Sequence, residues 1–139
     1  MSNKPVISAM YDAFARGDVQ FILDRVADDA EWEYGPVSTD IPWLQRARGR
    51  DGAARFFAGV VRDLHITKLE VKNILEDGLT VVVLCDIKAE MNGRHLVEED
   101  EVHIWHFDED GRVKKFRHRV DTHQLWIAYH ARPLAAAQA

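Results

Sequence analysis

The spacing of apolar residues predicts two helices at the start of the chain, followed by a short strand. Residues 5–16 and 19–26 carry apolar side chains three and four positions apart, which is typical of helices with one buried face. Pro5 suits a first helical turn, and Asp18 can cap the second helix. Residues 30–34 alternate in character and predict a strand.

From residue 65 onward the apolar period changes to two, which predicts antiparallel strands. The dipeptides Asp77-Gly78 and Asn92-Gly93 are typical of tight hairpin turns between such strands. A helix that starts at Asp51 precedes this region, and a helix from about 122 to 131 follows it. The predicted strands cover residues 66–76, 79–91, 95–107 and 112–120.

This order of elements predicts an α+β fold, because the helices are separate from an antiparallel meander. A curved antiparallel sheet wrapped on the N-terminal helices forms a cone that encloses a pocket. We expect one domain over residues 1–131 and a disordered tail at residues 132–139. The loop at residues 36–48, which contains Pro42-Trp43, is expected at the mouth of the pocket, where it would select the ligand.

The charge and composition exclude several classes of function. A net charge of -5 and a pI near 5.8 argue against nucleic acid as a partner, because phosphate binding needs a concentrated basic surface. The single cysteine, Cys85, cannot form an internal disulfide, so we expect a buried thiol and a reducing cytoplasm. The N-terminus has no signal-peptide pattern, and no apolar run approaches the roughly 20 residues needed to span a membrane.

Strand parity predicts which side chains face the pocket. Alternate residues of the strand that ends at residue 107 place Glu101, His103 and Trp105 on one face. In the next strand, Phe116 and His118 share a face. Because aromatic side chains gather on these two faces, we expect both faces to line the inside of the cone.

The opposite parity predicts an ion-paired outer face. Glu98 and Asp100 would lie opposite three basic residues of the next strand, so we expect cross-strand ion pairs. Val102 and Ile104 leave an apolar strip on the same face, which is compatible with a homodimer interface. The basic residues are Lys115, Arg117 and Arg119.

Three segments of the chain resemble a known superfamily. They are AMYDAFARGDVQFILDRVADDAEWEYGP, RGRDGAARFF and VHIWHFDEDGRVKKFRHRVDTHQL. In these segments the chain resembles the nuclear transport factor 2-like superfamily, in its SnoaL-like and ketosteroid isomerase-related branch, over residues 6–125. The resemblance implies a cone-shaped, cystatin-like fold with a pocket and a homodimer formed through the outer face of the sheet. It does not imply one function, because this fold carries many.

The isomerases of this branch suggest three positions. Tyr34 stands where they carry an Asp general base, and His103 stands where they carry the acid that donates a hydrogen bond to the oxyanion. Their second oxyanion donor is a Tyr, for which the nearest match here is Met10, with Tyr11 one position later. Since no carboxylate base remains, steroid-type isomerisation is disfavoured.

The polyketide cyclases of this branch suggest a different site. They place an acid/base Asp at the end of the last strand, where this chain has Asp121, and His103 or His118 could be its partner. A structural interpretation competes, because Asp121-Thr122-His123-Gln124 has the form of a capping box. Both roles are compatible if one carboxylate oxygen caps the helix and the other faces the pocket.

The remaining candidates are pocket-lining or polar partners. Glu101 could act as a base or as the hydrogen-bond partner of His118, and Glu101, His103 and His118 could in principle hold a metal on adjacent strands. We expect neither metal nor cofactor. Residues expected to line the pocket and bind the substrate, besides Glu101, are Tyr11, Trp32, Tyr34, Trp43, Trp105 and Phe116.

The function expected from these features is cofactor-independent acid/base catalysis on an apolar, carbonyl-containing or polyketide-like small molecule. Asp121 would be the acid/base, His103 its partner or an oxyanion donor, and Tyr34 a hydrogen-bond donor. The alternative is a non-catalytic module of the same fold, which binds a small molecule or serves dimerisation.

Overall fold

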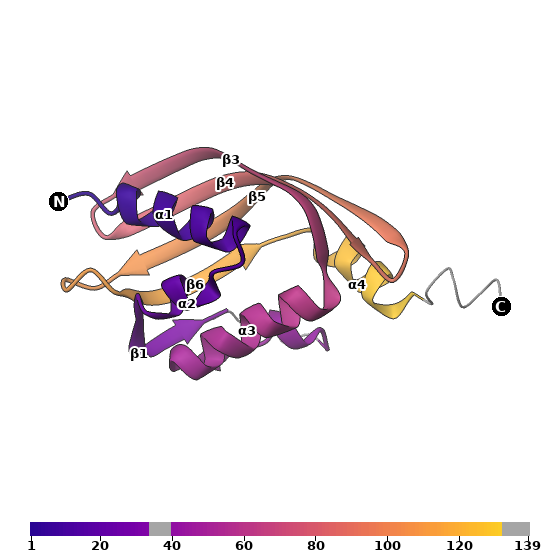
Figure 1. The fold of residues 1–139 in the computed structure, drawn as a ribbon, viewed down its shortest axis with the longest axis horizontal. Coiled ribbons are helices and arrows are strands. Elements are labelled where there is room, and N and C mark those ends of the chain that lie inside the picture. Colours follow the sequence, from indigo (N-terminus) through magenta and orange to yellow (C-terminus); the bar gives the residue numbers. More distant parts are fainter. Residues whose placement is uncertain (34–39, 132–139) are drawn as a thin grey trace.

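The computed structural model describes residues 1–33 and 40–131 (Figure 1). The predicted tail at 132–139 and the position of Tyr34 therefore lie outside the described residues. In chain order the elements are α1 (Lys4–Ala15), α2 (Val19–Leu23), β1 (Val26–Trp32), the 3-10 helix η1 (Pro42–Leu44), β2 (Ala47–Arg48), α3 (Gly49–Asp63), β3 (His65–Asp77), β4 (Thr80–Met91), β5 (Arg94–Phe107), β6 (Val113–Arg119) and α4 (Thr122–His130).

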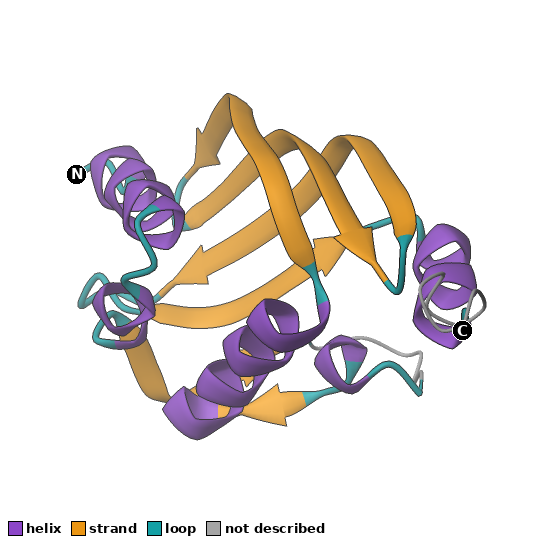
Figure 2. Cartoon of the chain, turned by 45° about the vertical axis from the view of Figure 1, so that its right-hand side comes forward, coloured by secondary structure: helices purple, strands orange, loops and turns teal. Residues whose placement is uncertain are grey.

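The strands form one six-stranded sheet in the order β2-β1-β6-β5-β4-β3. Strand β1 runs parallel to β6, and all other neighbours are antiparallel. The sheet curves around one side, where α1, α2 and α3 lie, while α4 lies at the end of the sheet away from the N-terminus (Figures 1 and 2). The predicted α+β fold with a curved sheet on N-terminal helices is confirmed.

The four-strand meander is close to its predicted limits. Asn92 and Gly93 join β4 to β5 with positive φ values of 52° and 76°, as a two-residue hairpin of the predicted kind requires. The first strand differs more, because it begins at Val26, a residue whose spacing fitted the preceding helix. Val26 instead pairs with Val113 of β6 and is fully buried.

A β-bulge in β5 changes which residues face inward. Between the pairs Cys85–Glu101 and Ile87–Glu98, β5 uses one residue more than β4, and Asp100 there has a positive φ of 55°. The extra residue reverses the parity of the strand before it. The placement of Glu98 on the outer face was therefore wrong, since its side chain lines the inner cavity.

The predicted outer ion pairs of β5 are also corrected. Asp100 lies 2.6 Å from the Nζ of Lys72 on β3, and the carboxylate of Glu98 accepts a hydrogen bond from the backbone N–H of Asp121. Lys115 lies 3.4 Å from Glu31 of β1. Strand β6 ends at Arg119, which pairs with Val102, so Glu98 and Asp100 lie beyond the paired part of β6 and meet other partners.

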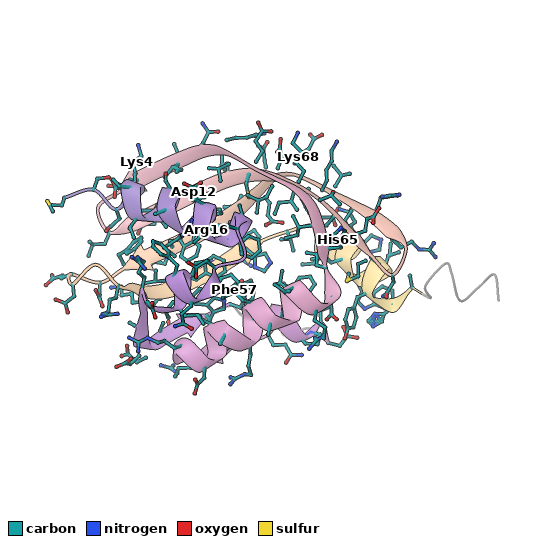
Figure 3. The ribbon with its side chains drawn as sticks, in the orientation of Figure 1. Lys4, Asp12, Arg16, Phe57, His65 and Lys68 are labelled. Carbon is teal, nitrogen blue, oxygen red and sulfur yellow. The ribbon has the colours of Figure 1, made fainter. Side chains whose placement is uncertain are left out.

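Two apolar clusters fill the space between the sheet and the helices. Trp32 is fully buried and stacks on Phe116 with ring centroids 4.5 Å apart. Each fully buried large side chain contributes roughly 1.5–3 kcal/mol to stability. Figure 3 shows Lys4 and Lys68 on the outside of the molecule, whereas Phe57 of α3 belongs to the core. Within the described ranges, no helix has the length and apolar character needed to cross a membrane.

Candidate functional site

A cavity lies between the concave face of the sheet and the helices α1 and α3. The cavity has a volume of about 100 Å³. Most of its wall is aliphatic or aromatic. The ionisable groups in the wall are the phenol of Tyr11 and the side chains of Glu98, Glu101, His103 and His118.

One side of the cavity carries a chain of buried hydrogen bonds. The indole N–H of Trp105 donates to the Tyr11 hydroxyl at 3.2 Å, and that hydroxyl bonds to Nδ1 of His103. On the other side of the ring, Nε2 of His103 lies 2.5 Å from Oε2 of Glu101. Burial raises the pKa of Tyr11 well above 10.0, so the phenol stays protonated and is able to donate to His103.

A second histidine–carboxylate pair joins β6 to the end of β1. Glu33 follows β1 with a positive φ of 53° and bonds to Nδ1 of His118. The same carboxylate oxygen accepts the backbone N–H of His118 at 3.0 Å. Burial by itself would lower the pKa of His118, but the charge and hydrogen bond of Glu33, aided by Glu101 and Glu98, raise it above 6.5.

The two histidines lie side by side on neighbouring strands of the sheet. His103 of β5 and His118 of β6 are direct cross-strand partners, and their ring centroids lie 6.0 Å apart. Tyr11 stacks almost parallel to His103, with an interplanar angle of 7°. The wall thus presents two imidazoles, each held by its own carboxylate, next to aromatic faces.

Glu98 and Cys85 complete the polar part of the wall and its backing. Both oxygens of Glu98 lie within 3.2 Å of the backbone nitrogen of Asp121, and burial, with Glu101 and Asp121 nearby, raises the pKa of Glu98. Cys85 lies behind His103, with Sγ 3.8 Å from Nε2. Burial, followed by the charges of Glu101 and Asp86, raises the pKa of the Cys85 thiol to about 12, so it is not an activated nucleophile.

Among the described residues, a group that could hold a metal ion is Cys85, Glu101 and His103, whose donor atoms lie within 4.8 Å of one another. Both nitrogens of His103 already bond to protein groups, Tyr11 and Glu101. A metal would have to displace one of these partners and deprotonate the thiol. The expectation of a metal-free site stays a prediction.

Several sequence-predicted residues meet in this cavity. Tyr11, Trp43, Glu101, His103, Trp105, Phe116 and His118 all line it, and their roles stay predictions. Trp32 does not line the cavity, because it is fully buried in the core against Phe116. Glu101 bonds to His103, whereas the carboxylate that bonds to His118 is Glu33.

Asp121 lies at the start of α4. Its carboxylate accepts the backbone N–H of Gln124 at 3.0 Å, which confirms the predicted cap. The residue is exposed and is not part of the described cavity wall. Gln124 in turn bonds to the backbone N–H and C=O of Val97, which fixes α4 to β5. The structure therefore does not bring Asp121 into the cavity beside His103 or His118.

Sequence reasoning missed Glu33 and Glu98. Simple alternation after Trp32 places Glu33 on the face away from the core, but its left-handed backbone directs the carboxylate to His118. The bulge has the equivalent effect for Glu98. An acidic residue at a strand end was the only available signal for Glu33, and it is a weak one.

Comparisons with known proteins place this geometry in a family. The model of the SnoaL-like domain family matches residues 7–116. No protein with a curated description matches the sequence. Among solved structures, an NTF2-like protein of unknown function from Burkholderia pseudomallei shares 27% identity, with a TM-score of 0.80, over 94% of this chain and 100% of that one.

Two further structures share the fold at lower identity. TerC, crystallised with polyporic acid, has 24% identity and a TM-score of 0.78 over 93% of this chain and 98% of its own. An LEH-like epoxide hydrolase from M. tuberculosis has 17% identity and a TM-score of 0.67 over 98% and 94%. The match to the family model covers most of the chain and agrees with the fold. The chain therefore belongs to the SnoaL-like domain family, as its sequence segments indicated.

Proposed function

We propose that this protein is a cofactor-independent acid/base enzyme that acts on an apolar, carbonyl-containing small molecule, with His118 as the proton-transferring residue. The observation that carries the proposal is the buried His118–Glu33 pair in the wall of an otherwise largely apolar cavity. A histidine oriented by a carboxylate is a common general acid/base arrangement. His118 takes the acid/base role expected for Asp121 from the sequence, because Asp121 lies outside the described cavity wall.

The ring geometry defines which atom does the chemistry. Glu33 occupies Nδ1 of His118, so Nε2 is the nitrogen available to a ligand in the cavity. Nε2 would take a proton from the carbon next to a carbonyl group, while the electron pair of the broken C–H bond moves onto the carbonyl oxygen. The protonated ring would then return the proton to carbon or to oxygen. Glu33 raises the pKa of His118 and so favours the protonated ring that forms when Nε2 takes the proton.

The fold relationships support small-molecule chemistry without defining it. One structure of the same fold is described as an epoxide hydrolase and another was crystallised with polyporic acid. Those activities and ligands belong to those proteins. For this chain they support the expectation that the cavity takes a small molecule.

A second candidate function is ligand binding without turnover. It is favoured by one observation: both histidines already bond to carboxylates of the protein, so the cavity could bind an apolar ligand without reacting with it. The two candidates differ in whether the protein accelerates proton exchange at carbon.

Deuterium exchange of enolisable ketones in D₂O, followed by ¹H NMR, tests the proposal without a known substrate. The panel consists of 1-indanone, 1-tetralone and 2-tetralone, which are small, apolar and enolisable. The wild-type protein should accelerate loss of the α-proton signal. His118→Gln should slow the catalysed rate by about 100-fold or more, because general acid/base groups contribute at least that much.

A matched control separates the site from general histidine effects. His95 is exposed, with Nδ1 3.3 Å from Glu90, and it does not line the described cavity, so His95→Gln should exchange at the wild-type rate. Exchange that survives in His118→Gln would contradict the role of His118. A wild-type protein that exchanges no ketone faster than buffer would exclude the catalytic proposal and favour the binding module.

We also propose a homodimer through the outer face of the sheet. Val82, Leu84, Val102 and Ile104 form a half-buried apolar group on this face of β4 and β5. Such a strip fits a self-complementary contact with a second copy of the chain. Light scattering should show that Val102→Asp is a monomer at concentrations where the wild type is a dimer; a Val102→Asp dimer would exclude this interface.

A further inference from the structure

The charged groups that line the cavity, apart from its two histidines, are of one sign. Glu98 and Glu101 both line it, and no lysine or arginine is found among the described residues of its wall. Among the described residues of the wall, an anionic ligand would therefore meet two carboxylates and no lysine or arginine.

The raised pKa values of the neighbouring groups agree with a negative charge in the cavity wall. Burial is the largest cause of the raised pKa values of Tyr11, Cys85 and Glu98, and the charge of Glu101 raises each of them further. For His118, Glu101 and Glu98 both contribute to the raised pKa against the effect of burial. Four groups around the same space thus respond to negative charge in the same direction.

The aromatic part of the wall also favours cations over anions. Trp105 and Phe116 pack with ring centroids 4.3 Å apart, and Tyr11 meets Trp105 edge-on at 6.2 Å. All three side chains line the cavity. The faces of aromatic rings attract cations and repel anions.

Glu98 is the carboxylate in the best position to meet a ligand. The carboxylate of Glu101 already bonds to His103, and the carboxylate of Glu33 already bonds to His118. Glu98 bonds to one backbone N–H, that of Asp121, and it is only partly buried. A carboxylate that accepts a single N–H still has lone pairs for a further donor.

We propose that the cavity selects ligands that carry a protonated amine on an apolar ring system, and that Glu98 sets this preference. The ring would lie against Trp105 and Phe116, and the ammonium group would bond to the Glu98 carboxylate. This inference rests on the proposed function only in placing the ligand in the same cavity.

Binding of three matched probes tests the preference directly. They are 1-naphthylmethylamine, 1-naphthylmethanol and 1-naphthoate, which share a ring system and differ in charge at neutral pH. By calorimetry, the amine should bind about tenfold more tightly than the alcohol, and the carboxylate about tenfold more weakly than the alcohol.

Two variants, each of which lacks one negative charge, test whether Glu98 causes the preference for the amine. Glu98→Gln keeps an oxygen that can accept the N–H of Asp121, so the fold should be retained, and the amine should fall to within about twofold of the alcohol. Glu99→Gln removes the same charge from the adjacent, exposed residue and should keep the tenfold preference. Thermal unfolding of both variants checks that the fold is intact.

Each other result overturns the inference. It is wrong if the carboxylate binds as well as the amine, if none of the probes binds, or if Glu99→Gln removes the preference as fully as Glu98→Gln does. The proposed function can fail separately, because ketone exchange depends on His118 and is measured with uncharged ligands. In the same way, His118→Gln should keep the preference for the amine.

Discussion

One carboxylate oxygen of Glu33 accepts two hydrogen bonds from His118, one from its backbone N–H at 3.0 Å and one from Nδ1 of its ring. The side chains are only 8% and 7% exposed, so water cannot easily replace either bond. The pair fixes both the position of the strand residue and the plane of its ring. Glu33 therefore occupies Nδ1 of His118, a residue of the cavity wall.

The first prediction concerns the pKa of His118. An NMR titration of the ring should give a value above 6.5 in the wild type, because the attraction of Glu33 outweighs the cost of burying the charged ring. Glu33→Gln should lower the value, since burial then lacks its main opposing charge. Glu31→Gln, which removes a carboxylate that pairs with Arg48 and Lys115, should leave it unchanged. An unchanged value in Glu33→Gln would contradict this account.

The same pair should make stability depend on pH. Because the folded pKa of His118 is raised above 6.5, its contribution to the free energy of unfolding is fully present below that pH. The contribution is lost as the pH rises through the folded pKa. Urea unfolding should therefore show that wild type exceeds Glu33→Gln by more at acidic than at alkaline pH. The pKa of His106 is lowered by burial and by Lys115, so this residue has the opposite effect on the pH dependence of stability. That effect is the same in the wild type and in Glu33→Gln, so it cancels in the comparison.

The third prediction separates the two roles considered for Asp121. Asp121→Ala should lower the free energy of unfolding by about 1 kcal/mol, because it removes the acceptor for the N–H of Gln124. Asp121→Asn should restore most of this stability and should keep the proton-exchange activity, because its side chain is not part of the described cavity wall. A stable Asn variant without exchange activity would instead identify Asp121 as the acid/base.

The parts of the fold that follow from local chemistry were predictable from sequence. The change of apolar period at residue 65 and the Asn92-Gly93 pair define the meander, because each acts through neighbouring residues. The inward positions of His103, Trp105, Phe116 and His118 follow from alternation on strands whose register holds in this region. The presence of these four residues in the candidate site could therefore be predicted from the sequence.

The rest depends on backbone conformations that non-glycine residues rarely adopt. Asp100 and Glu33 both have positive φ values, and no side-chain pattern distinguishes them from ordinary strand residues. Each redirects a carboxylate, so the partner of His118 and the inward position of Glu98 could not be read from alternation. Val26 was assigned to a helix because its spacing fitted one, whereas its pairing with Val113 depends on a distant strand.

The last prediction concerns the glycine that starts α3, the helix that carries Phe56 and Phe57 into the cavity wall. Gly49 has a φ of +72°, and a Cβ there would lie 2.7 Å from the carbonyl oxygen of Asp28. Gly78 has a similar φ of +59° but nothing within 4 Å of its Cβ position. Gly78→Ala should therefore cost only the left-handed strain, about 1–2 kcal/mol. Gly49→Ala should cost at least about 1 kcal/mol more in urea unfolding, because the backbone of β1 must shift; equal losses would show that this close approach relaxes without cost.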